Sequence, residues 1–124
     1  MITEDYVSFE TAKLLKEKGF DEPTLWFYVG DGTKYLAHKT LNGDWYRRPT
    51  LQMAMKWLRE IYKLEVRSTY DYDKDSWWGN INPMYEETVE NSNVYQKALR
   101  FDYQGKSYEE SCEAAIKYCL ENLI

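Results

Sequence analysis

Residues 49–72 read PTLQMAMKWLREIYKLEVRSTYDY, and a change of hydrophobic period inside this stretch decides the class of the fold. In its first half, apolar side chains recur at the i, i+3, i+4 and i+7 spacing of an amphipathic helix. From Leu64 onward, apolar and polar side chains alternate, as in a strand with one buried face. Because Thr50 can cap a helix, we expect a helix over residues 51–63 and a strand over residues 64–72.

Helical signals also occur near both ends of the chain. A helix is expected over residues 9–18, with Ser8 as its capping residue. Another is expected over residues 108–122, where Ser107 and Glu110 form the S-x-x-E pattern of a capping box. Each of these segments has a single apolar stripe, which indicates that one side of the helix is buried.

The segments between these helices have the pattern of short strands separated by turns. Gly30-Asp31-Gly32 and Asn42-Gly43 are the strongest turn signals. Further strands are expected over residues 25–29, 34–39, 44–47, 77–82, 85–89 and 94–103. Short connections favour antiparallel pairing, and one-sided helices favour packing on one face of a sheet. We therefore predict a single α+β domain over residues 1–124, a two-layer sandwich in which three helices cover a mainly antiparallel sheet of about 5–6 strands.

Three stretches of the sequence carry a resemblance to a known group of proteins. They are YVSFETAKLLKEKGF at residues 6–20, PTLQMAMKWLREI at residues 49–61 and SYEESCEAAIKYCLENLI at residues 107–124. These stretches resemble a group of small uncharacterised proteins of gut Bacteroidales and of their phages and integrated elements. The resemblance covers the three expected helices, under half of the chain. It implies an accessory protein of a mobile element that works inside a bacterial cell, and it implies no catalytic, cofactor-binding or metal-binding residue.

Charge and composition disfavour several classes of protein. The formal net charge is −5 at pH 7, which disfavours general nucleic-acid binding. No segment approaches the ~20 apolar residues that span a bilayer, and residues 1–5 carry acid where a signal peptide carries base. Cys112 and Cys119 lie seven residues apart in one expected helix, roughly 10 Å, so they cannot pair within it. Unpaired buried thiols fit a reducing compartment, so we expect a cytoplasmic protein without membrane contact.

Residues with catalytic or metal-binding chemistry are few. His38 is the only histidine, and it lies in an expected strand without a nucleophile motif nearby. A hydrolase that combines His38 with Cys112 or Cys119 is therefore disfavoured against an ordinary strand histidine. One histidine and two cysteines also cannot supply a clustered zinc site.

The acidic turn resembles a calcium-binding loop only in part. Asp71, Asp73 and Asp75 have the spacing of the first three ligands of an EF-hand loop. Ser76 stands where that loop needs glycine, and Asn82 stands where it needs a bidentate glutamate. We therefore interpret the segment as a solvated turn, and we predict no metal, no cofactor and no catalytic residue.

Aromatic residues are the one departure from an ordinary composition. The chain contains 12 tyrosines and 5 tryptophans, residue types that are enriched in protein interfaces. A simpler interpretation is that they cover the sheet, since aromatic residues favour strands. The candidate binding residues gather around the acidic turn: Tyr70, Tyr72, Trp77, Trp78, Tyr85, Asp71, Asp73 and Asp75.

These observations favour a non-enzymatic accessory or binding protein that acts on a protein partner through an aromatic and acidic surface. A second copy of the chain could use the same surface. The main alternative is a small enzyme with an unrecognised site, which needs a pocket with convergent polar groups. An electrostatic mimic of nucleic acid is another alternative, and it needs the acids of residues 71–75 and 86–90 on one contiguous face. Net acidity disfavours single-strand binding by stacked aromatic side chains.

Overall fold

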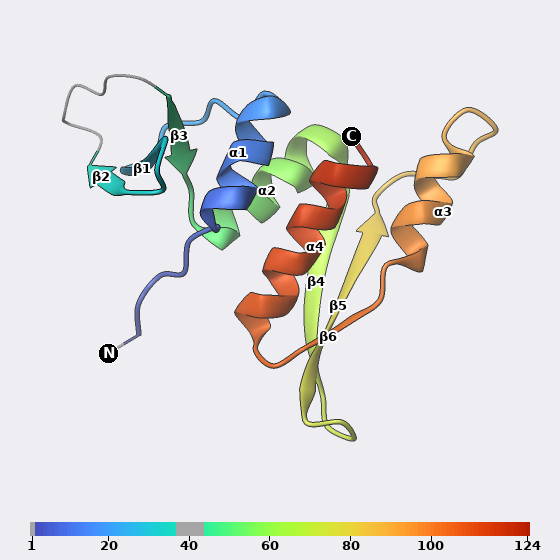
Figure 1. The fold of residues 1–124 in the computed structure, drawn as a ribbon. Coiled ribbons are helices and arrows are strands. Elements are labelled where there is room, and N and C mark those ends of the chain that lie inside the picture. Colours follow the sequence, from blue (N-terminus) through green and yellow to red (C-terminus); the bar gives the residue numbers. More distant parts are fainter. Residues whose placement is uncertain (1, 37–43) are drawn as a thin grey trace.

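The computed structural model describes residues 2–36 and 44–124, which contain four helices and six strands (Figure 1). All strand pairs are antiparallel, and helices pack against them, so the predicted α+β class is confirmed. In chain order the elements are α1 (Phe9–Glu17), β1 (Trp26–Val29), β2 (Lys34–Leu36), β3 (Trp45–Arg48), α2 (Leu51–Tyr62), β4 (Leu64–Asp71), β5 (Ser76–Pro83), α3 (Ser92–Arg100), β6 (Tyr103–Gly105) and α4 (Tyr108–Asn122).

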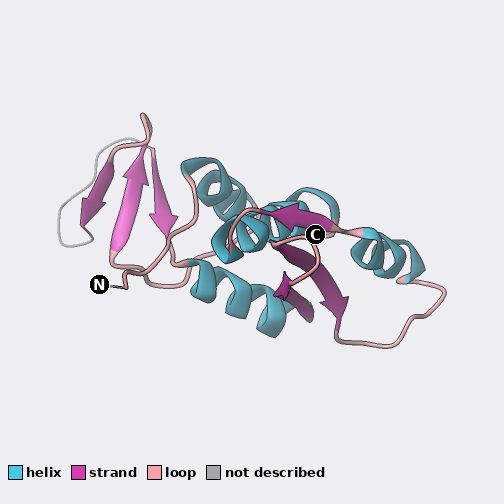
Figure 2. Ribbon diagram, turned by 90° about the horizontal axis from the view of Figure 1, so that it is seen from below, coloured by secondary structure: helices cyan, strands magenta, loops and turns pink. Residues whose placement is uncertain are grey.

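The strands divide between two sheets, where we expected one. The first sheet has the order β2-β1-β3 and the second the order β4-β5-β6. Figure 2 shows the first sheet at one end of the molecule, apart from the second. Helix α1 packs on β3, whereas α2 and α4 pack on the second sheet. The alternation of apolar residues identified most of the strands, but it does not say which strands pair with each other.

The three expected helices begin at the expected caps. The side-chain oxygens of Ser8, Thr50 and Ser107 each accept the backbone N–H three residues further on, at 3.0–3.2 Å. In a standard capping box, the Glu110 carboxylate would accept the backbone N–H of the N-cap residue, Ser107. Here Glu110 Oε2 instead accepts the N–H of the preceding residue, Lys106, at 2.8 Å. Local sequence therefore sets where these helices start.

The segment before α4 differs from our prediction. We expected a strand over residues 94–103, but most of it forms α3, and only its end enters β6. Val94, Ala98 and Phe101 have the i, i+4, i+7 spacing of a helix, and all three pack into or against the core. The strand expected over residues 85–89 is a loop that leads into α3. Tyrosines and valine in this stretch favoured a strand locally, and burial of the helical face overrides that preference.

Helix α4 lies unusually close to the second sheet at Ser111. A Cβ atom added to Gly79 of β5 would lie 3.0 Å from the Ser111 carbonyl oxygen. A Cβ atom added to Gly105 of β6 would lie 3.0 Å from the Ser111 amide nitrogen. Ser111 is fully buried, and its hydroxyl shares a hydrogen bond with the Ser68 hydroxyl of β4. The two glycines therefore leave the space that this helix occupies.

One buried cluster contains residues from both sheets and from all four helices. Leu15, Leu58, Leu64 and Ile116 are among its most completely buried members. The single domain stays a prediction. Within the described residues, no helix combines the length and the apolar character that a membrane crossing needs.

We predict that Gly79→Ala destabilises the fold by about 1–3 kcal/mol, because the new methyl group meets backbone that cannot move freely. Gly30→Ala is the matched control, since its Cβ would have only Asp44 O nearby, at 3.9 Å. The control should change the free energy of unfolding by less than about 1 kcal/mol. Urea denaturation of both variants measures the difference. Equal effects of the two substitutions would show that the close approach at Ser111 is absent.

Both cysteines should resist thiol reagents in the folded protein. Burial raises the pKa of Cys112 to about 11 and the pKa of Cys119 to about 12, so neither forms the reactive thiolate near neutral pH. We expect Ellman's reagent to modify neither thiol until the chain unfolds, and then to modify both. Rapid modification of either thiol in the folded protein would mean that α4 opens under native conditions.

Candidate functional site

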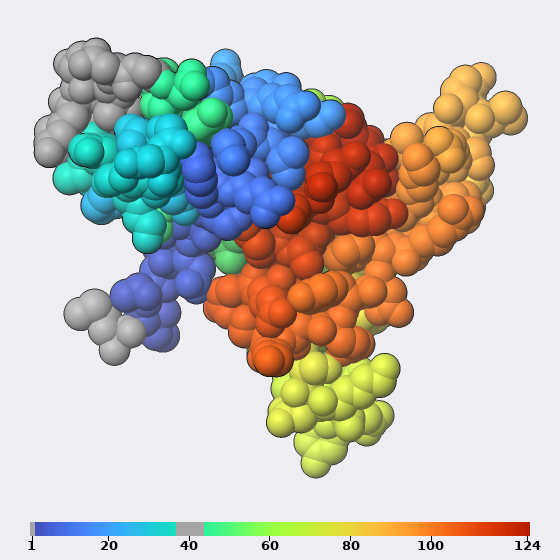
Figure 3. Space-filling view, viewed as in Figure 1, coloured from blue at the N-terminus to red at the C-terminus, as the bar shows by residue number. Residues whose placement is uncertain are grey.

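The acidic turn lies at the tip of the β4–β5 hairpin and projects from the body of the molecule. The last paired residues of this hairpin are Asp71 and Ser76, so residues 72–75 form the turn. In Figure 1 the hairpin extends beyond α4, and in Figure 3 its yellow-green tip forms a separate lobe. We call residues 70–76 the hairpin tip. Its projection makes it accessible to a large partner.

Internal hydrogen bonds order the hairpin tip. The Asp71 carboxylate accepts the backbone N–H of Asp73 at 3.1 Å and that of Lys74 at 3.4 Å. Asp75 has a positive φ of 46°, a conformation that aspartate tolerates better than most residues. Its carboxylate accepts the Tyr70 hydroxyl at 2.5 Å, and this hydrogen bond raises the pKa of Tyr70. The turn therefore has a defined shape without a ligand.

A row of aromatic rings connects the hairpin tip to α4. The ring centroids of Tyr70 and Trp77 are 5.4 Å apart, and those of Trp77 and Tyr108 are 5.7 Å apart. Both pairs have the edge-to-face geometry that aromatic rings prefer. Trp77 is half-buried between its two neighbours. The Trp77 ring therefore supports the tip and stays partly exposed.

Trp78 points to the opposite face of the second sheet. It stands beside Thr69 on β4, and 39% of its surface is exposed. Its indole N–H donates to the Asp102 carboxylate at 2.6 Å, which holds the ring in place. Asp102 was not among the predicted site residues. The local sequence carries no signal for it, because the contact joins residues 24 positions apart.

Seven of the eight predicted site residues lie at the hairpin tip or beside it, and Tyr85 does not. Tyr72 has 86% of its surface exposed and Tyr70 has 45%. Tyr85 follows the opposite end of β5, where it packs against Tyr95 with a centroid distance of 5.9 Å. Burial raises the pKa of Tyr85. Tyr85 therefore belongs to the packing of α3, separate from the aromatic surface of the tip.

The acidic side chains also form two separate groups. The acids of the tip and those of residues 86–90 lie at opposite ends of β5, which seven residue steps make roughly 23 Å long. Figure 1 shows the tip and the loop before α3 at opposite ends of the hairpin. The Glu87 carboxylate accepts hydrogen bonds from Ser92 and Gln96 of α3, which lowers its pKa. The single acidic face that a nucleic-acid mimic needs is not present among the described residues.

A cluster of metal-binding side chains is also absent from the part of the chain that the structure describes. Within residues 2–36 and 44–124, no three His, Cys, Asp or Glu side chains are placed to hold a metal ion. Asp71 and Asp75, two of the three residues with EF-hand spacing, form the hydrogen bonds of the turn instead. His38 lies outside the described residues.

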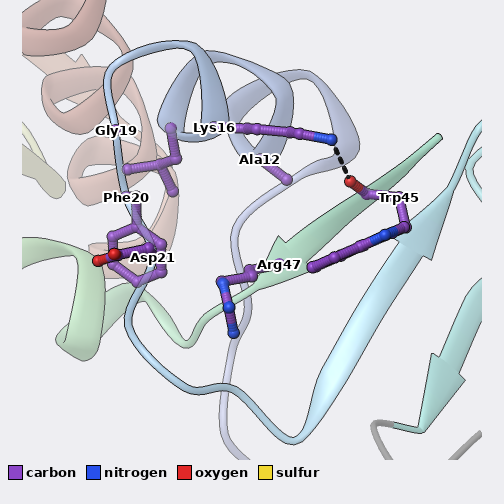
Figure 4. A pocket seen from close by; sticks show the side chains of 8 residues that line it. Ala12, Lys16, Gly19, Phe20, Asp21, Trp45 and Arg47 are labelled. Carbon is purple, nitrogen blue, oxygen red and sulfur yellow. Dashed lines mark hydrogen bonds between the residues drawn. The ribbon is translucent and has the colours of Figure 1, made fainter.

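A second feature of the surface is a pocket of about 270 Å³ between α1 and β3 (Figure 4). Gly19 ends α1 in the left-handed region, with φ of 92°, and turns the chain so that the Phe20 N–H donates to the Leu15 carbonyl at 2.9 Å. This arrangement places Phe20 and Asp21 on one side of the pocket and β3 on the other. The lining residues are Ala12, Leu15, Lys16, Gly19, Phe20, Asp21, Trp45 and Arg47. The sequence patterns did not predict this pocket, because residues 12–21 form one side and Trp45 and Arg47, far along the chain, form the other.

We predict that Asp75→Asn lowers the pKa of Tyr70, because the carboxylate that accepts its hydroxyl hydrogen bond and opposes the phenolate is removed. Asp73→Asn is the control, since it removes the same charge from the same turn without touching this hydrogen bond. NMR titration of the Tyr70 ring measures both variants. An unchanged Tyr70 pKa in Asp75→Asn would contradict the ordered tip described above.

Comparisons with known protein families, with curated proteins and with solved structures find no match for this chain. Its function must therefore be inferred from its own residues. The hairpin tip and the pocket between α1 and β3 are the two surfaces that carry such an inference.

Proposed function

We propose that this protein is a non-enzymatic binding protein whose hairpin tip contacts a basic surface on a protein partner. The observation that carries the proposal is Tyr72, 86% exposed at the end of a projecting and hydrogen-bonded turn. The resemblance noted in the sequence adds a source to the proposal, a bacterial phage or integrated element, and would place the partner in the host cell.

The order of the turn favours binding. A loop that is fixed before binding loses little conformational freedom when a partner covers it. Here the Asp71 carboxylate accepts hydrogen bonds from two backbone N–H groups, and the Asp75 carboxylate accepts one from the Tyr70 hydroxyl. Tyrosine adds a large contact area with few rotatable bonds, so Tyr72 can dock at low entropic cost.

Charge defines the kind of partner. Residues 71–75 contain three carboxylates and one ammonium group, which gives the turn a net charge of −2. An exposed acidic projection attracts a basic surface and increases the rate of association. The interaction should therefore weaken as the ionic strength rises.

Trp78 extends the surface that a partner can cover. It lies on the sheet face opposite α4, held by Asp102, and it is partly exposed. A partner that contacts both the tip and this face would bury tyrosine and tryptophan, the residue types that dominate binding energy in protein interfaces.

A small enzyme is the second candidate, and it needs a pocket with convergent polar groups such as the pocket between α1 and β3. Lys16, Asp21 and Arg47 supply convergent polar groups there. Among the described residues that line it, none is a serine, cysteine or histidine, and the Lys16 ammonium group donates to the Trp45 carbonyl at 2.9 Å. The described lining of this pocket therefore lacks the serine, cysteine or histidine that most nucleophile–base pairs use.

We predict that a Tyr72→Ala/Asp73→Asn variant loses the partner in an affinity capture from bacterial lysate, while the wild type retains it. The matched control is Val89→Ala/Glu90→Gln, in the loop before α3. It removes the same charge and alters a side chain that is 93% exposed. Both variants should keep the unfolding free energy of the wild type, because neither Tyr72 nor Val89 is packed.

Two results would count against the proposal. One is a partner that binds the tip variant as well as the wild type. The other is a partner that is lost equally from the tip variant and the loop variant, since a general effect of charge would then explain the loss.

A further inference from the structure

We propose that the pocket between α1 and β3 binds a small aromatic monocarboxylate, a flat ring with one carboxylate group. This inference is independent of the hairpin tip and concerns a different surface. Four features of the pocket support it: an apolar base, an aromatic wall, two cations and a single acid.

The base and wall of the pocket suit a flat ring. Ala12, Leu15 and Phe20 are almost fully buried and supply the apolar base. The Trp45 indole forms one wall, and an edge-to-face contact with Phe27, at a centroid distance of 5.1 Å, fixes it. The volume of about 270 Å³ is slightly below the usual range for ligand pockets, about 300–1,000 Å³, so the ligand must be small.

Arg47 supplies one cation, and its guanidinium N–H groups can donate hydrogen bonds to a ligand. Its guanidinium carbon lies 5.9 Å from the Phe27 ring centroid and 5.6 Å from the Trp45 ring centroid. This cation–π contact holds the group in place without consuming its N–H donors. In the described part of the chain, no carboxylate lies within ion-pair distance of Arg47. A planar guanidinium group is well suited to bind a carboxylate through two parallel hydrogen bonds.

Lys16 supplies the second cation from the opposite element. Its ammonium group donates to the Trp45 carbonyl at 2.9 Å and lies 4.9 Å from the Tyr46 ring centroid. Figure 4 shows the Lys16 side chain reaching from α1 to the Trp45 carbonyl along the edge of the pocket. The ammonium group has three donors, and this hydrogen bond uses one of them. Two cations at one pocket contrast with the net charge of −5 of the whole chain.

Asp21 limits the charge of the ligand. It lines the pocket on the side of Phe20, so the lining residues carry two positive charges and one negative charge. A ligand with a single carboxylate would neutralise the remaining positive charge. A dicarboxylate or a phosphate dianion would instead leave the pocket and its ligand with a net negative charge. The pocket should therefore prefer a monoanion.

The test is an NMR titration of the folded protein with benzoate, the simplest ligand of this class. We expect chemical-shift changes centred on Lys16, Phe20, Trp45 and Arg47, with a dissociation constant near or below about 1 mM. Benzamide, which has the same shape and no charge, should bind at least about tenfold more weakly, as should acetate, which has no ring. Phthalate, with a second carboxylate, should also bind more weakly than benzoate, and Asp21→Asn should reduce that difference.

Two variants with the same loss of charge complete the test. Arg47→Gln should weaken benzoate binding at least about tenfold, and Arg67→Gln on β4 should leave it unchanged, since Arg67 pairs with Glu65 on another surface. Tyr72→Ala should also leave it unchanged, which separates this proposal from the binding function of the tip. Benzamide binding as tightly as benzoate, equal effects of the two arginine variants, or no localised shift up to about 20 mM benzoate would each overturn the proposal. The ligand comparisons use the wild-type protein, so they decide the matter even where a variant folds poorly.

Discussion

Helix α4 lies directly against the second sheet at Ser111, and this contact positions the aromatic rings that support the hairpin tip. Gly79 and Gly105 have no side chains, and a Cβ atom at either position would lie 3.0 Å from the Ser111 backbone. The helix can therefore lie directly on the strands and bury the apolar face of β4 and β5. This close approach places Tyr108, one turn before Cys112, against the ring of Trp77.

A series of side-chain contacts connects α4 to the hairpin tip. The Trp77 ring packs against Tyr108, and the Tyr70 ring packs against Trp77. The Tyr70 hydroxyl then donates a hydrogen bond to the Asp75 carboxylate. The tip is thus an extension of the core that projects into solvent. The pocket between α1 and β3 belongs to the other sheet and gathers positive charge, so the molecule carries two surfaces of opposite character.

Local sequence predicted the three helices that begin at a side-chain cap, but it missed α3, whose N-cap residue Asn91 makes no capping hydrogen bond through its side chain. Caps such as Ser107 act within one turn, so their effect can be read directly from neighbouring residues. Pairing between strands depends on segments that lie far apart in the sequence. The alternation of apolar and polar residues therefore does not show whether the strands form one sheet or two. Trp77 and Trp78 are adjacent in sequence, yet one supports the tip and the other faces solvent, because only one face of β5 is covered by α4. Asp102 and the pocket of Arg47 likewise arise from long-range contacts that periodicity does not encode.

Backbone ¹⁵N relaxation of residues 71–75 is the measurement that tests most directly whether the core holds the tip in one shape. A tip held in one shape should have order parameters of about 0.8 or higher in this turn, similar to those of β4 and β5. Values below about 0.6 in the turn, with rigid strands beside it, would show that the core does not order the tip, and the proposed binding surface would then not exist before a partner arrives.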